Sequence, residues 1–396
     1  MKRKITEISV YEFFMCMFVI AIHLLSEGVD AFPKWSALSI TFLSLTKLMT
    51  FAVPGFVFTS AIKLFYKYGD RKFNYPKFLL GRFLRVYFPY ILAVCVYYLV
   101  FVYLLDLDGF HEFNFKELLG FILRGDISAQ FYFVILIVQF YLLMPLWVLI
   151  AKSKSNVFSG FFLALSLVLT LLSRMYFPQS AAAIVKWFGS LNLPFDNPAA
   201  NLDIPSTILT LGGYTNKFFT SYLVVWLAGM YIGINYEKFT EVIEGSKPVI
   251  YLGWLILAVS HCILSYMALG GIVRYTLEPV VVVMFCLFSI FGFYIYANNL
   301  TISLERMGKG FLSSIAGASY DIYLIHCLII TVVSYYLGHI EMESVLARFW
   351  ITTGITYSVS IILCVLKTTL QTNIKLSHHR RSAAKARKTA RRKRYL

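Results

Sequence analysis

Long, nearly uninterrupted runs of apolar residues alternate along the chain with short polar segments rich in Lys and Arg. A helix needs about 20 predominantly apolar residues to cross the hydrocarbon core of a bilayer. Transmembrane strands instead show short segments in which apolar and polar residues alternate. The runs in this chain are of the first kind, and the pattern predicts an all-α polytopic membrane protein with about ten transmembrane helices.

The expected spans have the approximate limits Tyr11–Leu25, Ile40–Phe65, Val86–Leu105, Phe131–Ala151, Val157–Met175, Phe218–Ile234, Val249–Met267, Leu277–Tyr296, Leu312–Leu337 and Leu346–Leu370. The longest connection, Tyr176–Asn216, contains four prolines and is expected to be an external loop. Basic residues cluster in every second connection, and such clusters mark the cytoplasmic side of a membrane protein. The pattern therefore places both termini in the cytoplasm.

Composition supports this class, because 59% of the 396 residues are hydrophobic and only 14% are charged. The net charge of +16 does not indicate a nucleic-acid partner, because much of it lies in the C-terminal segment Lys375–Arg394. We expect residues 1–375 to form the transmembrane domain and residues 376–396 to form a disordered basic cytoplasmic tail. Such a tail is attracted to anionic lipid headgroups, so membrane lipids are its expected partner.

The cysteines do not indicate a metal or redox site. All six fall inside apolar runs, where Cys behaves as a small hydrophobic residue, and no CxxC pair is present. We therefore expect no metal and no permanently bound cofactor.

The first apolar run carries Glu12 near its start and His23 near its end. An ionisable side chain within a span is costly and indicates function, although a polar side chain can also bridge two helices by a hydrogen bond. Measured from Ile8 along a helix, His23 lies about 22 Å away, nearer the outer face. A neutral imidazole there can act as general base on a hydroxyl or carry an acyl group transiently. His23 is the candidate catalytic residue.

Arg82 and Arg85 are spaced i, i+3, which places both guanidinium groups on one face of a helix. Because Arg forms bidentate contacts with phosphate, the pair is a candidate site for an anionic cytoplasmic ligand such as a coenzyme. The alternative is that both residues only anchor the start of a span. Glu12 faces the same side, where Arg82 or Lys4 is its expected partner.

Further candidates for lining a substrate cavity come from two other apolar segments. Asp321, Tyr323 and His326 give one predicted helix three polar groups, which either line a cavity or bond to neighbouring helices. Tyr141 precedes a proline that can kink its helix. His261 is a weaker candidate, for which we expect a structural role.

An ordered set of motifs covers nearly the whole chain. Its members are the first-helix His23, VPGFVFTSA (Val53–Ala61), RFLR with the following FPY (Arg82–Tyr90), FYFVILIVQFYLLMP (Phe131–Pro145), WLAGMYIG around Gly229, and SYDIYLIH (Ser319–His326). This set resembles the integral-membrane acyltransferase family 3, which includes bacterial O-acyltransferases that act on surface polysaccharides. The chain is also similar to the subgroup associated with O-succinylation of the intercellular adhesin, poly-N-acetylglucosamine.

The resemblance implies an O-acyltransferase of the bacterial cytoplasmic membrane. Acyl-coenzyme A would be the donor substrate, with its phosphates near Arg82 and Arg85 and its thioester reaching toward His23. An acetyl or succinyl group would then pass to a hydroxyl of a cell-surface or secreted carbohydrate. The family usually has an arginine eleven positions before the histidine. Glu12 stands there in this chain, which reverses a charge near the expected donor path.

Two other functions are consistent with the sequence. The chain can be a transporter or exporter of a polysaccharide or a lipid-linked intermediate, or a catalytically inactive partner in a surface-polymer assembly. Replacement of His23 by Ala separates these hypotheses. The acyl group, the acceptor glycan and the oligomeric state are left open by the sequence.

Overall fold

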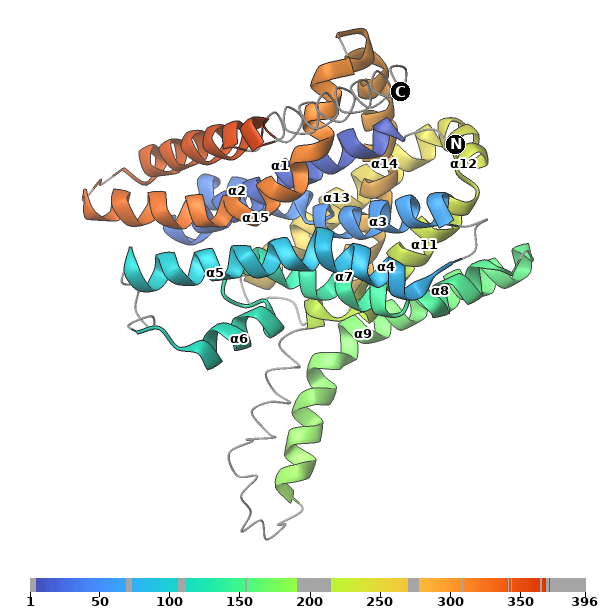
Figure 1. The fold of residues 1–396 in the computed structure, drawn as a ribbon, viewed down its shortest axis with the longest axis horizontal. Helices are drawn as coiled ribbons and strands as arrows, with labels where there is room; N and C mark the ends of the chain where they lie inside the picture. The colour runs from blue at the N-terminus through green and yellow to red at the C-terminus, as the bar shows by residue number, and fades with distance from the viewer. Residues whose placement is uncertain are drawn as a thin grey trace, which may run out of the picture.

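The structure is a computed structural model. It describes residues 5–68, 73–105, 112–153, 155–190, 215–269, 278–307, 309–340, 342, 344–363, 365–367 and 370, with the backbone alone at 30, 177–190, 215 and 306–318. Within these residues every regular element is a helix (Figure 1), which confirms the all-α class. The predicted basic tail, 376–396, and its predicted disorder lie outside the described residues.

The helices follow one another as α1 (Thr6–Ala31), α2 (Ala37–Met49), α3 (Ala52–Tyr68), α4 (Tyr75–Arg82), a π-helical segment (Phe83–Tyr87), α5 (Phe88–Tyr103), α6 (Phe115–Arg124), α7 (Tyr132–Leu142), α8 (Met144–Ala151), α9 (Asn156–Ser190), α11 (Leu223–Ile234), α12 (Tyr236–Gly245), α13 (Lys247–Leu269), α14 (Glu278–Met307), α15 (Lys309–His339) and a last helix at Val345–Lys367. Short 3-10 turns at Ala129–Phe131 and Phe219–Tyr222 lead into α7 and α11.

Eight of the described helical segments are long and apolar enough to cross a membrane, which confirms a polytopic membrane protein. A ninth is present if α6 and Ala129–Leu142, bent by 54°, count as one span. Two expected spans look different in the structure. Phe219–Ile234 is a shorter apolar helix. Phe131–Ala151 is interrupted at Leu143, where Pro145 in the first turn of α8 has no N–H to continue the hydrogen-bond ladder.

The expectation of an external loop at Tyr176–Asn216 is wrong in its first part. Helix α9 continues through Pro178 to Ser190 and projects from the bundle of helices (Figure 1). The residues after Pro178 include three consecutive alanines, the strongest helix formers, and these favour continuation of the helix. Residues 191–214 lie outside the described part of the chain.

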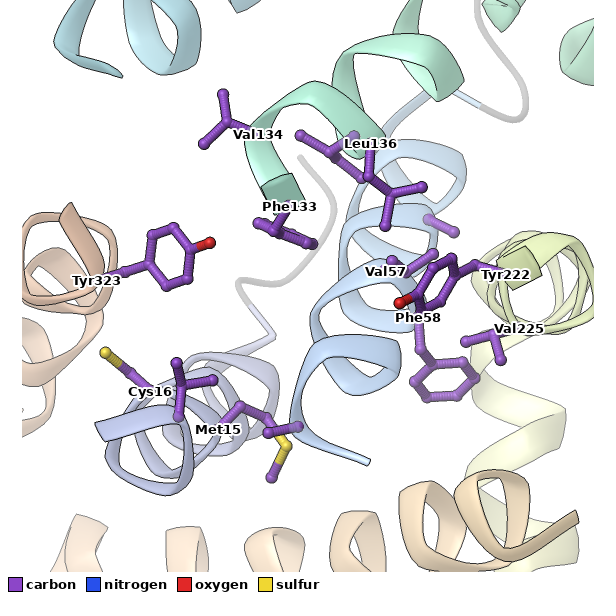
Figure 2. Packing of buried hydrophobic residues seen from close by; sticks show 14 of the residues in the cluster. Met15, Cys16, Val57, Phe58, Phe133, Val134, Leu136, Tyr222, Val225 and Tyr323 are labelled. Atoms are coloured by element: carbon purple, nitrogen blue, oxygen red, sulfur yellow. The ribbon is translucent and has the colours of Figure 1, made fainter. Parts of the chain in front are cut away.

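Helix α1 lies at the centre of the bundle, in contact with α2, α3, α14 and α15. Its buried side chains, among them Met15 and Cys16, belong to the large hydrophobic core (Figure 2). Helix α11 lies unusually close to α3. A Cβ at Gly229 would meet the carbonyl oxygen of Phe58 at 2.5 Å, and one at Gly233 would meet that of Ile62 at 2.7 Å. Small residues at this spacing let two helix backbones approach in a membrane, so the WLAGMYIG motif serves packing.

Two segments that the charge pattern assigns to the cytoplasm lie together at one end of the bundle. Tyr236 of α12 donates a hydrogen bond to the carboxylate of Glu7 at 3.0 Å and shares another with the hydroxyl of Tyr294 at 2.7 Å. The start of α1 and the connection after α11 are therefore on the same side. This agrees with the predicted topology, in which the inner side is cytoplasmic.

Candidate functional site

Helix α1 presents two ionisable side chains on nearly the same face. Glu12 and His23 are eleven residues apart, which is about three helical turns and about 16 Å along the axis. Each residue lines a different cavity. We name these the inner cavity, which contains Glu12, and the outer cavity, which contains His23, after the sides predicted by the charge pattern.

The inner cavity has a volume of about 340 Å³. Its polar and charged lining is Glu12, Ser60, Lys63, Lys67, Arg82, Arg85, Tyr141, Ser319, Tyr320 and Tyr323. Four cationic side chains thus face one carboxylate. An excess of positive charge in a partly enclosed site attracts anions such as phosphate.

Arg82 and Arg85 reach this cavity from an irregular stretch of helix. The π-helical segment Phe83–Tyr87 lies between α4 and α5, and the N–H of Phe88 bonds back to the carbonyl of Phe83. Pro89 follows, and it has no N–H to donate. Such π segments are frequent at functional sites. The structure therefore brings together the two arginines that the sequence singled out.

The two arginines differ in their surroundings. The guanidinium of Arg82 packs against the rings of Phe78 and Tyr141, at 5.4 and 5.5 Å from their centroids. Cation–π contacts of this kind hold the side chain in place. Arg85 is exposed. Arg82 is therefore the better ordered of the two, and Tyr141 contributes to its position as well as to the cavity wall.

Glu12 forms an ion pair with Lys63 of α3. The expected pairing with Arg82 is therefore wrong, and the other expected partner, Lys4, lies outside the described residues. Lys63 follows an apolar stretch of α3, one helical turn before Lys67, and the two lysines extend the basic lining of the inner cavity. Because Lys63 neutralises Glu12, Lys67 and the two arginines keep their charge available for a ligand.

The outer cavity is larger, about 580 Å³. Its polar and charged lining comes from seven helices and the turns between them, and comprises His23, Lys47, Thr50, Gln130, Tyr132, Arg174, Asn216, Ser221, Tyr222, His261, Glu278 and Tyr323. The volume lies within the range of roughly 300–1,000 Å³ that is usual for ligand pockets. His23, half-buried on α1, thus opens onto a space that can hold a small substrate.

Tyr323 lines both cavities. Its hydroxyl donates a hydrogen bond to the backbone carbonyl of Gln130, and its ring lies against Phe133 at 5.6 Å and Phe56 at 6.1 Å. Figure 2 shows Tyr323 of α15 pointing toward Phe133 of α7. His23 and the arginine pair therefore do not open onto one continuous cavity in this structure. They belong to two cavities that meet at this tyrosine.

His326 lies fully buried behind His23, with the two ring centroids 5.4 Å apart. It is not part of the lining of either cavity. Its Nδ1 is 3.2 Å from the carbonyl oxygen of Ile322, and because a carbonyl only accepts, this nitrogen carries the proton. Nε2 has no hydrogen-bond partner within the described part of the chain. In the neutral ring it is an acceptor, available to an N–H of His23.

A hydrogen-bond network that sequence reasoning missed shapes α15 around His326. The hydroxyl of Tyr97 donates to the carbonyl of Leu324 at 3.0 Å and accepts from the N–H of Leu328 and the side-chain amide of Gln130, both at 2.8 Å. The hydroxyl thus takes the place of one backbone hydrogen bond in the helix that carries His326. No sequence pattern predicts this network, because Tyr97 lies in a run of apolar and aromatic residues.

Asp321, a predicted cavity residue, lies elsewhere. Its carboxylate pairs with the ammonium of Lys367 at 2.5 Å, and both side chains are partly exposed. The residue is absent from the lining of both cavities. Its place on α15 explains the difference, because residues 321 and 323 are separated by about 200° around a helix.

His23 and two neighbouring side chains have the chemistry of metal ligands. The ligand atoms of His23, His326 and Cys327 lie within 4.8 Å of one another. Zinc is commonly held by imidazole nitrogen and thiolate sulfur at 2.0–2.3 Å, which are the donor atoms that these three side chains offer. The sequence expectation of no metal is thus open to a direct test.

Two cations in the outer cavity were also missed, although the sequence contains their signal. Lys47 follows ten residues of α2, inside the expected span Ile40–Phe65, and Arg174 lies near the end of the expected span Val157–Met175. A single cationic residue inside an apolar run indicates a functional site as strongly as a histidine there does. His261, expected to be structural, is buried, and its Nε2 lies 3.4 Å from the hydroxyl oxygen of Thr50.

Comparison with known proteins adds the family. Residues 7–368 match the model of the Acyl_transf_3 family, which is described as an acyltransferase domain. No match was found among curated proteins or among solved structures. The matched region covers nearly the whole chain and contains His23, both arginines and the linings of the two cavities. The chain therefore belongs to acyltransferase family 3 and is a multi-pass membrane acyltransferase.

Proposed function

We propose that the enzyme transfers an acyl group from cytoplasmic acyl-coenzyme A to a hydroxyl of a carbohydrate at the outer face of the membrane. The observation that carries the proposal is the arrangement along α1. A basic inner cavity and an outer cavity that contains His23 share one wall residue, Tyr323. A donor with phosphates can bind on one side and a hydroxyl-bearing acceptor on the other.

On the donor side, Arg82 and Arg85 bind the coenzyme phosphates, supported by Lys67. Arg suits this role because its planar fork bonds two phosphate oxygens at once. The Glu12–Lys63 pair stands deeper along the path toward His23 and contributes little net charge. This pair takes the place of the single arginine that the family usually has at the position of Glu12.

At His23, one imidazole nitrogen is kept free of a proton if the other donates to Nε2 of His326. In the direct route the free nitrogen takes the proton of the acceptor hydroxyl as its oxygen attacks the thioester carbonyl. The new C–O bond forms, the C–S bond breaks, and the coenzyme leaves as a thiolate that takes the proton back. In the carrier route the nitrogen itself attacks the carbonyl, the C–S bond breaks and the coenzyme leaves as a thiolate. The acceptor hydroxyl then attacks the acyl-imidazole, the C–N bond breaks, and the hydroxyl proton passes to the thiolate.

Either route requires the thioester to pass Tyr323, because this residue separates the arginines from His23. Its packing against Phe56 and Phe133 and its hydrogen bond to Gln130 hold the wall closed in this structure. We infer that donor binding moves the Tyr323 ring.

The experiment compares membranes that contain the wild type, His23→Ala or His339→Ala, supplied with radiolabelled acetyl- or succinyl-coenzyme A. His339 is a matched control because it is an exposed histidine at the end of α15, bonded to its own helix. Label should enter the surface glycan with the wild type and the control. With His23→Ala it should fall by about 100-fold or more, the usual contribution of a general base.

Other outcomes would contradict the proposal. Retained transfer in folded His23→Ala protein would remove His23 from the mechanism. Loss of glycan export with no acyl change would favour a transporter, and no label with either donor would favour an inactive partner subunit. The donor that is used also tests the finer proposal, membership in the O-succinyltransferase subgroup.

A quenched reaction separates the two routes at His23. Wild-type protein is mixed with labelled donor in the absence of acceptor and precipitated at neutral pH within milliseconds. Label that stays on the protein and is absent from His23→Ala establishes the carrier route. Label that stays on the donor, in protein that labels the glycan once the acceptor is added, establishes the direct route.

The proposal has consequences for location and partners. A cytoplasmic donor and an external acceptor place the enzyme in the bacterial cytoplasmic membrane, with its basic tail, 376–396, against anionic lipids. The acceptor is a surface or secreted glycan.

A further inference from the structure

Lys47 is a charged residue inside an apolar span. The span Ala37–Tyr68 begins ten residues before it, and its neighbours on α2 are mostly apolar. The ammonium forms no ion pair and no hydrogen bond with any residue that the structure describes, and the side chain lines the outer cavity. An intramembrane cation without a partner is expensive and marks a ligand path.

Arg174 of α9 lines the same cavity, and contacts with neighbouring residues hold its side chain in place. Its Nε donates to the carbonyl of Ser221 at 3.0 Å, and its guanidinium lies 5.2 Å from the centroid of the Tyr222 ring. The neighbouring Ser173 bonds the hydroxyls of Thr220 and Ser221 at 2.8 and 3.2 Å. These contacts fix the side chain while leaving its two terminal nitrogens without a carboxylate partner among the described residues.

The turn around Lys47 is also anchored. The hydroxyl of Thr50 donates to the backbone carbonyl of Lys47 at 2.7 Å, and Nε2 of the buried His261 lies 3.4 Å from the same hydroxyl. Ser265 lies 3.5 Å from Nδ1 of His261. A chain of polar contacts from α13 thus supports the end of α2 from which the ammonium extends.

The charge of the outer cavity is therefore unbalanced. Two basic side chains, Lys47 and Arg174, line the cavity with a single carboxylate, Glu278, which forms an ion pair with neither of them within the described residues. The positive-inside rule does not explain them, because Lys47 lies inside the apolar segment Ala37–Tyr68 and Arg174 lies toward the predicted outer side. A ligand that supplies negative charge does explain them.

We propose that the outer cavity contains an anion subsite, in which Lys47 and Arg174 bind a carboxylate or phosphate carried by a molecule that reacts at His23. This inference rests on the proposed function. The anionic group has two chemical sources. It belongs to the acceptor, as a uronate or a phosphate substituent of the carbohydrate, or it is the distal carboxylate of a dicarboxylic acyl group such as succinyl.

The test uses Lys47→Gln and Arg174→Gln, with Lys152→Gln as a matched control at the exposed end of α8. Transfer to glucuronyl-N-acetylglucosamine is compared with transfer to the neutral di-N-acetylchitobiose, each with acetyl- and with succinyl-coenzyme A. Because a hydrogen-bonded charge contributes about 10- to 100-fold to binding, each variant should lose that factor only in reactions that contain the anion.

The pattern of loss identifies the source. Selective loss with the acidic disaccharide under both donors assigns the anion to the acceptor. Selective loss with succinyl-coenzyme A under both acceptors assigns it to the acyl group. Equal activity in all four reactions, or an equal loss in all four from protein that elutes as a folded species, overturns the subsite. Lys47→Arg and Arg174→Lys should recover part of the lost activity.

Equilibrium binding keeps this result separate from the proposed function. Purified protein is titrated with the acidic and the neutral disaccharide, and with succinate and acetate, in the absence of any donor. Binding of an acidic probe that weakens in Lys47→Gln would support the subsite even if no acyl transfer were detected. No preference for acidic probes in the wild type, together with uniform transfer rates, would contradict it.

Discussion

The two cavities obtain their positive charge in different ways. In the inner cavity Lys63, Lys67, Arg82 and Arg85 lie near the predicted cytoplasmic edge, where basic residues also serve membrane topology. In the outer cavity Lys47 and Arg174 come from two helices far apart in sequence and have no topological purpose. A cation in the membrane-embedded part of a chain is therefore the stronger evidence for a ligand, although the inner cluster is easier to notice.

The two cavities also differ in whether their single carboxylate forms an ion pair. Glu12 is paired with Lys63 in the inner cavity, so the ion pair leaves the charge of Lys67, Arg82 and Arg85 without a carboxylate partner in the lining of that cavity. Glu278 has no such pair within the described residues of the outer cavity. Donor binding should therefore depend on the summed charge of the inner group, whereas binding in the outer cavity should depend on individual side chains.

The largest effect in the series is expected at the boundary between the cavities. Tyr323→Ala removes the ring that both cavities share and joins them. Acyl transfer should fall sharply, while hydrolysis of acyl-coenzyme A without acceptor should rise, because water gains access to the thioester. Free coenzyme release and glycan labelling measured in parallel report both quantities. A matched change at Tyr336, exposed on the same helix, should alter neither. Parallel loss of both activities would contradict the role of Tyr323 as a wall.

The next effect concerns the support of His23. His326→Phe keeps a ring in the same buried position but removes the Nε2 acceptor. In the proposed direct route His23 becomes charged in the transition state and donates to Nε2 of His326. The rate of transfer at saturation should therefore fall by about 10- to 100-fold, the value of a hydrogen bond to a charged group. The KM values for donor and acceptor should stay unchanged, because His326 lines neither cavity. Steady-state kinetics measure the split, and an altered KM with an unchanged rate would show that His326 acts on binding instead.

The inner cluster is tested by Arg82→Gln and Arg85→Gln. Each should raise the KM for acyl-coenzyme A by about tenfold, the lower end of the value of a hydrogen bond to a charged group. The KM for the acceptor should not change, which separates these variants from those at Lys47 and Arg174. Arg85→Lys should retain more function than Arg82→Lys, because Arg82 also packs on the rings of Phe78 and Tyr141. Equal recovery by lysine at both positions would contradict this difference.

A smaller effect is expected at Glu12 of α1, which stands where the family usually has an arginine. Glu12→Gln leaves Lys63 unpaired and adds one net positive charge to the inner cavity. The KM for acyl-coenzyme A should fall by about two- to fivefold, because partly exposed ion pairs contribute about 0.2–1 kcal/mol. The effect should diminish at high ionic strength, since salt screens exposed charges. A rise in KM would mean that the carboxylate itself contacts the donor.

The smallest effect is expected from Cys327→Ser, combined with a metal chelator. If His23 works through a free nitrogen, neither treatment should change the rate of transfer. Metal analysis of the purified protein should find no stoichiometric zinc. If the serine variant lost both its zinc and its activity, the result would contradict the role of His23 as base or carrier and would favour a metal-centred reaction.

Much of the fold was accessible from the sequence because apolar length alone identifies spans. Helical spacing predicted that Arg82 and Arg85 share one helix face, and a proline kink made Tyr141 a candidate cavity residue, but only the structure places the three in one cavity. The sequence did not show that α9 continues past Pro178, since a proline and a polar residue there resemble the start of a loop. Pairwise contacts between distant helices, such as Glu12 with Lys63, also have no local signal.

The same limit explains the mixed outcome on α15, where Tyr323 lines both cavities and Asp321 and His326 line neither. Asp321, Tyr323 and His326 were grouped because they are close in sequence and polar. In the structure Asp321 forms an ion pair with Lys367, Tyr323 forms the shared cavity wall, and His326 lies behind His23. Helical geometry alone separates their directions, but which direction meets which neighbour is decided by packing against α1, α7 and the last helix.

The position of Tyr323 also bears on cell energetics. An enzyme that joins a cytoplasmic donor to an external acceptor must hold a continuous electrical barrier while a small acyl group crosses it. A passage open from end to end would let protons flow down the membrane potential at every catalytic cycle. Tyr323 forms a wall common to both cavities, so under the proposed function its ring would keep the membrane insulating between turnovers. The same side chain would then limit how large an acyl group the enzyme can move without depolarising the cell.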